Sequence, residues 1–137
     1  MAEEKGKVKI LKKLQGHDWQ VSSVAFHPAG DMLASASWDR TVRIWDINEG
    51  KELRIIERGA HTAPITCVAW HPNGALLCTT SADMTTCLWD ASTGSRLRTL
   101  KEHFGWVTKC SFAPDRTKLA TASWGTPSLN YVFKECS

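Results

Sequence analysis

Apolar and polar residues alternate along this chain in short runs, and these runs predict β-strands. Residues 21–26, 32–37 and 41–45 combine β-branched, small and aromatic side chains, and a fourth run covers residues 51–56. The segments between the runs contain Pro, Gly, Asn and Asp, which favour turns. No segment shows a sustained apolar period of about 3.6 residues. The pattern therefore predicts an all-β fold.

The order of residues in the first part of the chain recurs further along. It occurs over residues 16–46 and 59–90 and begins a third time over residues 103–124. The second copy follows the first by 44 residues, and the third follows the second by 42. A period of about 40–45 residues is typical of arrays in which each repeat is one supersecondary unit. Because one such unit cannot bury its apolar faces alone, we expect the repeats to stack.

Each full copy carries a small residue followed by His, a turn Asp, and a strand that ends in Trp-Asp. These are Gly16-His17, Asp39 and Trp45-Asp46, then Ala60-His61, Asp83 and Trp89-Asp90. This pattern resembles the WD-repeat family, and the resemblance covers roughly residues 11–124. It implies a β-propeller, in which four-stranded sheets form blades around a central channel. We expect a partial propeller of about three four-stranded blades, with the last blade incomplete and the ring not closed.

The repeat boundaries divide the chain into five parts. A basic segment, residues 1–13, begins the chain, and the strand expected over residues 7–14 corresponds to the outer strand that closes the ring in whole propellers. The parts that follow are WD repeat 1 (14–56), WD repeat 2 (57–100), a partial WD repeat 3 (101–124) and a divergent tail (125–137).

The resemblance also implies a buried polar network in each full blade. In the family, a His, a strand Ser or Thr, the turn Asp and the strand Trp form a hydrogen-bonded chain. By position these networks are His17, Ser37, Asp39 and Trp45, and His61, Ser81, Asp83 and Trp89. These groups can form such a chain. A carboxylate only accepts hydrogen bonds, a hydroxyl both donates and accepts them, and an indole N–H only donates. A missing member leaves a buried polar group unpaired, at a cost of about 1–3 kcal/mol.

The third copy departs from the pattern after Trp124. Gly125 stands where the other copies have the turn Asp, so His103 and Ser123 are expected to lose their partner. Tyr131 falls on the position of the strand Trp, but its neighbours alternate one residue out of phase with the earlier copies. We expect a third blade with a poor outer strand and no fourth strand. We therefore expect the chain to be a fragment or a shortened isoform of a larger propeller protein.

Seven tryptophans are many for 137 residues, and four of them are not explained as blade core. The four are Trp19, Trp38, Trp106 and Trp124. By family geometry their loops share one rim of the propeller, so we interpret them as a candidate partner-binding rim. The alternative is that they pack on one another between neighbouring blades. The second repeat has Ala63 and Ala82 at these positions, which makes the rim discontinuous.

Ser, His and Asp together also suggest a hydrolase, with Ser37 as nucleophile and His17 as base. The same trio occurs twice at identical spacing, which favours packing, because an active site is not normally duplicated in every structural unit. The sequence contains no phosphate-binding loop, dinucleotide fingerprint or metal-ligand spacing. We therefore expect no catalytic residue, no cofactor and no metal. His27 and His71 precede prolines in equivalent turns, where we expect solvated rings.

Composition and charge narrow the range of partners. The chain is 42% hydrophobic and 23% charged, and its net charge of +3 is too small and too scattered to indicate direct binding of nucleic acid. No stretch approaches about 18 apolar residues, so no membrane span is expected. The five cysteines are odd in number and lack C-x-x-C spacing, which favours packing in a reducing compartment. We expect a location in the cytoplasm, the nucleus or both.

The resemblance to the WD-repeat family implies a non-catalytic scaffold module that binds other proteins. A second hypothesis is a truncated product with no independent activity, and the hydrolase is a third. Open blade faces would expose apolar surface and unpaired strand edges. We therefore also expect self-association through those faces.

Overall fold

The computed structural model describes residues 5–57, 59, 61–125 and 131–134. Within these residues the chain forms eleven β-strands and no helix, and hence no helix long and apolar enough to cross a membrane. The strands are β1 (Val21–Phe26), β2 (Met32–Ser37), β3 (Val42–Asp46), β4 (Lys51–Ile56), β5 (Ile65–Trp70), β6 (Leu76–Ser81), β7 (Thr86–Asp90), β8 (Arg96–Leu100), β9 (Val107–Phe112), β10 (Lys118–Ser123) and β11 (Tyr131–Lys134). The predicted all-β class is confirmed.

Consecutive strands pair with each other in three antiparallel sheets. The first sheet contains β1–β4, the second β5–β8 and the third β9–β11. Tight turns make this possible: the N–H of Gly30 donates to the carbonyl of His27 at 2.8 Å, and Gly30 has a φ of 82°. The next turn of each of the first two sheets also contains a residue with a left-handed φ. This residue is Arg40 (69°) between β2 and β3 and Met84 (73°) between β6 and β7. Each sheet is therefore an up-and-down meander.

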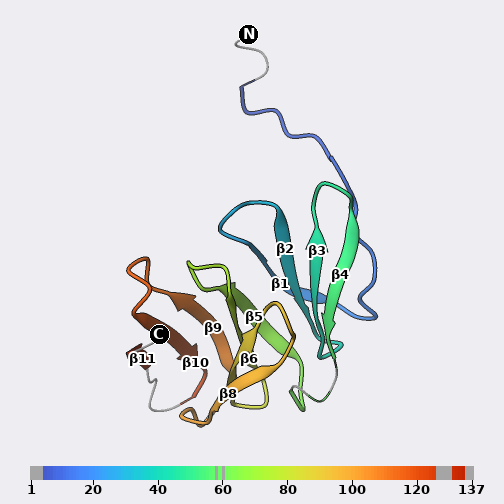
Figure 1. Cartoon of the computed structure of the whole chain (residues 1–137). Helices are drawn as coiled ribbons and strands as arrows, with labels where there is room; N and C mark the ends of the chain where they lie inside the picture. Colours follow the sequence, from blue (N-terminus) through green and yellow to red (C-terminus); the bar gives the residue numbers. More distant parts are fainter. Residues whose placement is uncertain (1–4, 58, 60, 126–130, 135–137) are drawn as a thin grey trace.

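The three sheets stack side by side through their first strands (Figure 1). β1 packs against β5, and β5 packs against β9. The third sheet does not return to the first, so the arrangement is an open arc. The expected partial propeller, with an open ring and an incomplete last blade, is confirmed.

The apolar cores lie between the sheets. The core between the first and second sheets contains Ala34, Ala36, Val42, Ile44, Ile56, Ile65, Val68, Trp70, Leu77, Cys87 and Trp89. The core between the second and third sheets contains Cys67, Cys78, Leu88, Cys110 and Leu119. The sides of neighbouring sheets that face each other are therefore buried by stacking, as a repeat architecture requires. The four described cysteines are free and buried, and Cys136 lies outside the described residues.

The strand expected over residues 7–14 is not formed. Residues 7–20 contain no strand, and the side chains of Val8, Ile10 and Leu11 are exposed. Figure 1 shows the chain leading away from the sheets toward its N-terminus. A strand exists only where a neighbouring edge supplies hydrogen bonds, and none of the described strands pairs with this segment. The prediction is therefore wrong for this structure.

The third sheet differs from the others in the register of its last strand. β10 pairs with β11 so that Leu119 lies opposite Phe133. In the first sheet Leu33, the equivalent of Leu119, lies opposite Trp45. The prediction that Tyr131 takes the position of the strand Trp is therefore wrong, and Phe133 takes it instead. The cause is a longer connection between β10 and β11 than between β2 and β3, which moves the register by two residues.

Candidate functional site

A buried hydrogen-bonded chain in the second sheet links the indole of Trp89 to the carboxylate of Asp83. The indole N–H donates to Thr79 Oγ1 at 2.8 Å, and this oxygen is hydrogen-bonded to Nε2 of His61 at 2.7 Å. On the other side of the imidazole, Nδ1 is hydrogen-bonded to Asp83 Oδ2 at 2.8 Å. Thr79 and His61 are buried. The network therefore joins β6, the following turn and the loop before β5 through bonds shielded from water.

The first sheet repeats this network with Ser35 as its hydroxyl. Trp45 Nε1 donates to Ser35 Oγ at 2.8 Å, and His17 Nε2 is hydrogen-bonded to the same oxygen at 2.7 Å. His17 Nδ1 is hydrogen-bonded to Asp39 Oδ2 at 2.9 Å. Asp39 also accepts from the hydroxyl of Thr41 at 2.6 Å. The carboxylate therefore holds its own turn closed while it anchors the histidine.

Ser37 and Ser81, the predicted hydroxyls, lie two residues beyond the hydroxyls that the networks use. Ser37 Oγ donates to the carbonyl of Gln20 at 2.8 Å and accepts from the N–H of Asp39 at 3.0 Å. Ser81 makes the equivalent bonds in the second sheet. The prediction is wrong at these two positions because residues two apart in a strand share a face. The residue nearer the middle of the strand faces the indole, and the one at its end faces the loop.

The networks shift the ionisation of the groups that they bury. Burial opposes the charged form of Asp83, but hydrogen bonds from His61 and Thr85 outweigh it and lower the pKa of Asp83. Burial also opposes the charged form of His61, yet its bond to Asp83 and the neighbouring Cys87 raise the pKa of His61 to about 9. In the first sheet, hydrogen bonds likewise outweigh burial and lower the pKa of Asp39. His61 and Asp83 therefore form an ion pair at neutral pH.

The third sheet keeps part of the network. His103 Nε2 is hydrogen-bonded to Thr121 Oγ1 at 2.8 Å. Gly125 occupies the position that holds the Asp in the other two repeats, and burial lowers the pKa of His103. Ser123, expected to lose its partner, donates its hydroxyl to the carbonyl of Trp124 at 2.8 Å. The negative charge of Glu102 opposes this lowering of the His103 pKa but does not outweigh the effect of burial.

The Ser37–His17 pairing that the hydrolase hypothesis needs is not formed. Ser37 Oγ is bonded to backbone groups, and His17 Nε2 is bonded to Ser35. Ser35 is itself buried and holds the indole of Trp45, which keeps it from a substrate. Among the described residues, no group of three or more His, Cys, Asp or Glu side chains could hold a metal ion. This geometry favours a packing role for the networks.

The prediction of solvated rings for His27 and His71 is wrong. His71 is buried, meets Phe112 edge to face and donates from Nε2 to the carbonyl of Arg116 at 3.1 Å. His27 meets Trp70 in the same way, with ring centroids 4.7 Å apart. Both histidines therefore bridge neighbouring sheets. The signal available in the sequence was their recurrence at equivalent positions of two repeats.

Four tryptophans form two exposed pairs, one in the loops of the first sheet and one in the loops of the third. Trp19 and Trp38 meet edge to face, with ring centroids 6.0 Å apart. Trp106 and Trp124 stack, with centroids 5.6 Å apart and an interplanar angle of 4°. The four side chains remain between 39% and 68% exposed. Because the pairs occupy equivalent loops of sheets stacked in one arc, they face the same side, which we call the tryptophan rim.

Each tryptophan pair forms within one repeat, so the alternative of packing between neighbouring blades is not what the structure shows. The second sheet separates the two pairs. It contributes Ala63 and Ala82, both half-buried, at the equivalent positions. The rim is therefore discontinuous, as predicted from the sequence.

Comparison with known proteins associates this geometry with one family. The family described as WD domain, G-beta repeat, matches residues 8–46, 50–90 and 94–126. A Periodic tryptophan protein 2 homolog of Schizosaccharomyces pombe is 58% identical over 38 residues, which are 28% of this chain and 4% of that protein. U4/U6 small nuclear ribonucleoprotein PRP4 of Saccharomyces cerevisiae is 41% identical over 54 residues, 39% of this chain and 12% of that protein.

A third relative is Nuclear distribution protein PAC1 of Gibberella zeae, 44% identical over 57 residues, which are 41% of this chain and 12% of that protein. This chain therefore corresponds to between 4% and 12% of the length of these three relatives. The family match, in contrast, covers most of the chain in three consecutive segments, and the sheets and their buried networks recur with the same period. The chain belongs to the WD-repeat family.

Proposed function

We propose that this WD-repeat chain is a non-catalytic scaffold module that binds other proteins through its tryptophan rim. The observation that carries the proposal is the pair of exposed aromatic clusters, Trp19 with Trp38 and Trp106 with Trp124. Tryptophans concentrate in the centres of protein interfaces because they bury a large area with few rotatable bonds. The partner is another protein, bound without a cofactor.

The rigidity of the loops supports this role. The turn Asp of each full repeat holds its loop by bonds to a histidine and to the backbone, as Asp39 does with the N–H groups of Asp18 and Thr41 at 3.0 and 2.8 Å. Trp38 precedes this Asp directly, and Trp19 follows Asp18. An interface loop that is ordered before binding loses less entropy when the partner arrives. The buried networks thus act as the support for the rim.

The test is a quantitative pull-down with the intact chain and with a Trp38→Ala, Trp124→Ala double variant. We expect the variant to lose the partners of the intact chain, because removing one aromatic of each pair should weaken binding by about tenfold or more. A Leu53→Ala, Leu97→Ala variant is the matched control, since both leucines are exposed on outer strands away from the rim. An unchanged partner list for the tryptophan variant would refute the proposal.

We further infer a location in the cytoplasm, the nucleus or both. One relative is named as a small nuclear ribonucleoprotein. The four described cysteines are unpaired, which is consistent with a reducing compartment. Imaging of the tagged chain would test the location.

We also propose that the chain is divided into repeats at residues 14–56, 57–100 and 101–124. The three sheets support this division.

A further inference from the structure

The two faces of each sheet have different neighbours. We call the face turned toward the next sheet along the chain the trailing face, and the face turned toward the previous sheet the leading face. The leading face of the second sheet includes Val68 and Trp70, which are 3% and 8% exposed. The equivalent residues of the first sheet, Val24 and Phe26, are 59% and 66% exposed. The difference arises because the first sheet covers the second leading face, whereas among the described residues only the segment 9–14 lies beside the first leading face.

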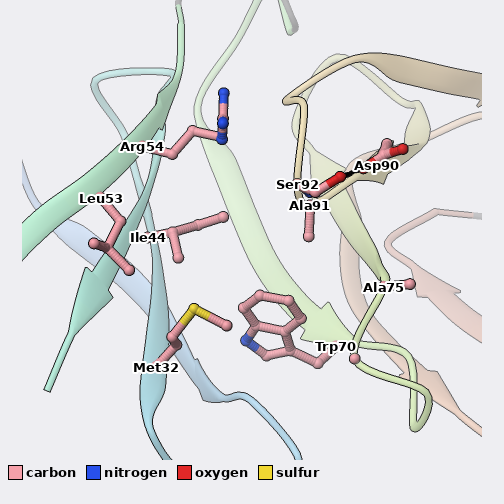
Figure 2. Close-up of a pocket in the computed structure, with 10 residues that line it drawn as sticks. Met32, Ile44, Leu53, Arg54, Trp70, Ala75, Asp90, Ala91 and Ser92 are labelled. Carbon is pink, nitrogen blue, oxygen red and sulfur yellow. Dashed lines mark hydrogen bonds between the residues drawn. The ribbon is translucent and has the colours of Figure 1, made fainter.

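Side chains from the trailing face of the first sheet cover Trp70. Figure 2 shows Met32 and Ile44 pointing toward the indole, beside a pocket of about 400 Å³ lined by both sheets. The indole N–H of Trp70 also donates to the carbonyl of Ala25 at 3.0 Å. The structure therefore contains its own example of what a leading face binds.

A hydroxyl and a histidine cross each junction between sheets to reach backbone carbonyls. At the first junction, Ser22 Oγ donates to the carbonyl of Ile65 at 2.5 Å, and His27 Nε2 donates to the carbonyl of Gly74 at 3.2 Å. The equivalent threonine and histidine of the second sheet repeat both bonds to the third. The junction is thus defined by the same polar groups twice, in addition to apolar contact.

The leading face of the first sheet has backbone carbonyls that could accept the hydrogen bonds of such a junction. The carbonyls of Val21 and Gly30 stand at the positions of the two acceptors. Phe26 lies in a groove of about 620 Å³ that is the counterpart of the pocket beside Trp70. Apolar residues of this groove are Leu11, Leu14, Leu33 and Ile47, and Lys9 and Lys12 add positive charge to its lining.

We propose that the leading face of the first sheet docks the trailing face of a WD-type blade supplied by another polypeptide. The incoming blade carries Ser or Thr at the position of Ser22, His at that of His27 and a Met, Leu or Ile side chain at that of Met32. Carboxylates near the groove complement Lys9 and Lys12. This surface is distinct from the tryptophan rim.

A second copy of this chain does not meet that description. The trailing face of its third sheet carries Lys109 and Lys118 at the positions of Ser23 and Met32, and Ala113 replaces the histidine. Docking would desolvate the exposed ammonium group of Lys109 and would bury Lys118 together with Asp115, its ion-pair partner at 3.3 Å, against apolar side chains, and both are costly. The lysines would also approach the two lysines of the groove. Lysines on an uncovered sheet are a known means of preventing association, and here they exclude the chain's own third sheet.

The test uses the full chain and a partner made from it. The partner carries Lys109→Ser, Ala113→His and Lys118→Met, so that its third sheet has the trailing-face residues of the first, and Phe26→Glu, which blocks its own leading face. We expect a one-to-one complex with the intact chain in sedimentation velocity. Its affinity should exceed that of the intact chain for itself by at least about tenfold.

Variants of the intact chain locate the contact. Val24→Glu, at an exposed position, should weaken the complex by at least about tenfold. Leu97→Glu, whose side chain is similarly exposed on β8, should leave it unchanged. The Trp38→Ala, Trp124→Ala variant should also bind normally, which separates this surface from the proposed function of the rim.

Three results would overturn the proposal: no complex, a complex insensitive to Val24→Glu, or self-association of the intact chain as tight as its binding to the partner. Amide exchange in β9 and β10 shows whether the substituted third sheet is folded. If it is not, the chain with Lys109→Ser and Phe26→Glu serves as the partner, because Lys109 is exposed. Since Lys118 and Ala113 remain, its gain in affinity should be smaller, but it should still exceed self-association of the intact chain and be lost with Val24→Glu.

Discussion

The hydroxyl of each buried network serves two ring nitrogens at once. In the second sheet, Thr79 Oγ1 accepts from the indole of Trp89 and is bonded to the imidazole of His61. A hydroxyl oxygen has two lone pairs and one proton, so it can satisfy both rings. Removing this single atom leaves two buried nitrogens without a partner. The cost should exceed that of a single lost hydrogen bond.

We expect Thr79→Val, which preserves the shape of the side chain, to lower the free energy of unfolding by about 2–3 kcal/mol. Urea denaturation measures this change. Ser111→Ala, at an exposed position of β9, is the control and should change the free energy of unfolding by less than about 0.5 kcal/mol. Equal effects of the two substitutions would contradict the role assigned to the network.

The ion pair of His61 and Asp83 should make stability depend on pH. The pKa of His61 is about 9 in the folded chain, above its ordinary value of 6.5. A histidine whose pKa is raised by folding stabilises the folded chain fully at a pH below its pKa in the unfolded chain. This stabilisation is lost as the pH rises through its pKa in the folded chain, and here it amounts to about 3 kcal/mol at most. We expect the free energy of unfolding to fall as the pH rises above about 6.5. The neighbouring Cys87 thiol, whose pKa is in spite of burial lowered by its bond to His61, opposes this fall at higher pH.

Chemical denaturation across this pH range tests the expectation, with His61→Gln as the comparison. The variant should be less stable than the intact chain at low pH, and its stability should change less as the pH rises. A profile of the intact chain that is as flat as that of the variant would show that the pair does not titrate in this way.

Stacking makes the three sheets unequal as elements. The second sheet is covered on both faces, whereas the third is held by the smaller core alone. Leu119 of β10 is 1% exposed within that core. Local openings begin where few buried contacts hold an element. The third sheet should therefore open before the first two.

We expect Leu119→Ala to destabilise the third sheet by about 2–5 kcal/mol through the cavity that it leaves. Amide exchange should accelerate in β9 and β10, while β2 and β3 keep their protection. Leu97→Ala, at an exposed position, should change neither. Equal acceleration in all three sheets would mean that the molecule opens as one unit.

Local pattern predicted the strands inside the repeats well, because alternation and turn residues act over a few positions. The runs at 21–26 and 51–56, for example, became β1 and β4. It failed where pairing depends on a distant partner: residues 7–14 found no edge, and Phe133 took the position expected for Tyr131. It also could not choose between two hydroxyls on one strand face. That choice depends on which side chain lies across the sheet.

The whole molecule is an arc with two chemically different ends. The first sheet presents Val24 and Phe26 outward, and the third sheet presents Lys109. A head-to-tail contact between such ends generates rings or filaments when the ends match. Here the two ends are not complementary, because the end formed by the first sheet is apolar and the end formed by the third sheet is charged. The all-β fold and its open arc followed from the repeat, but this asymmetry required the burial of individual residues.

Under the proposed function, the gap in the tryptophan rim has a consequence for how a partner is selected. The second sheet, packed on both sides, holds the two aromatic pairs at a fixed separation. A partner that engages one pair brings the other within reach at a high effective concentration, provided that its own two contact points are correctly spaced. Fragments that reach a single pair would bind weakly. In the proposed function, the alanines of the second sheet would thus favour partners with two contact points and discriminate among them by the spacing of those points.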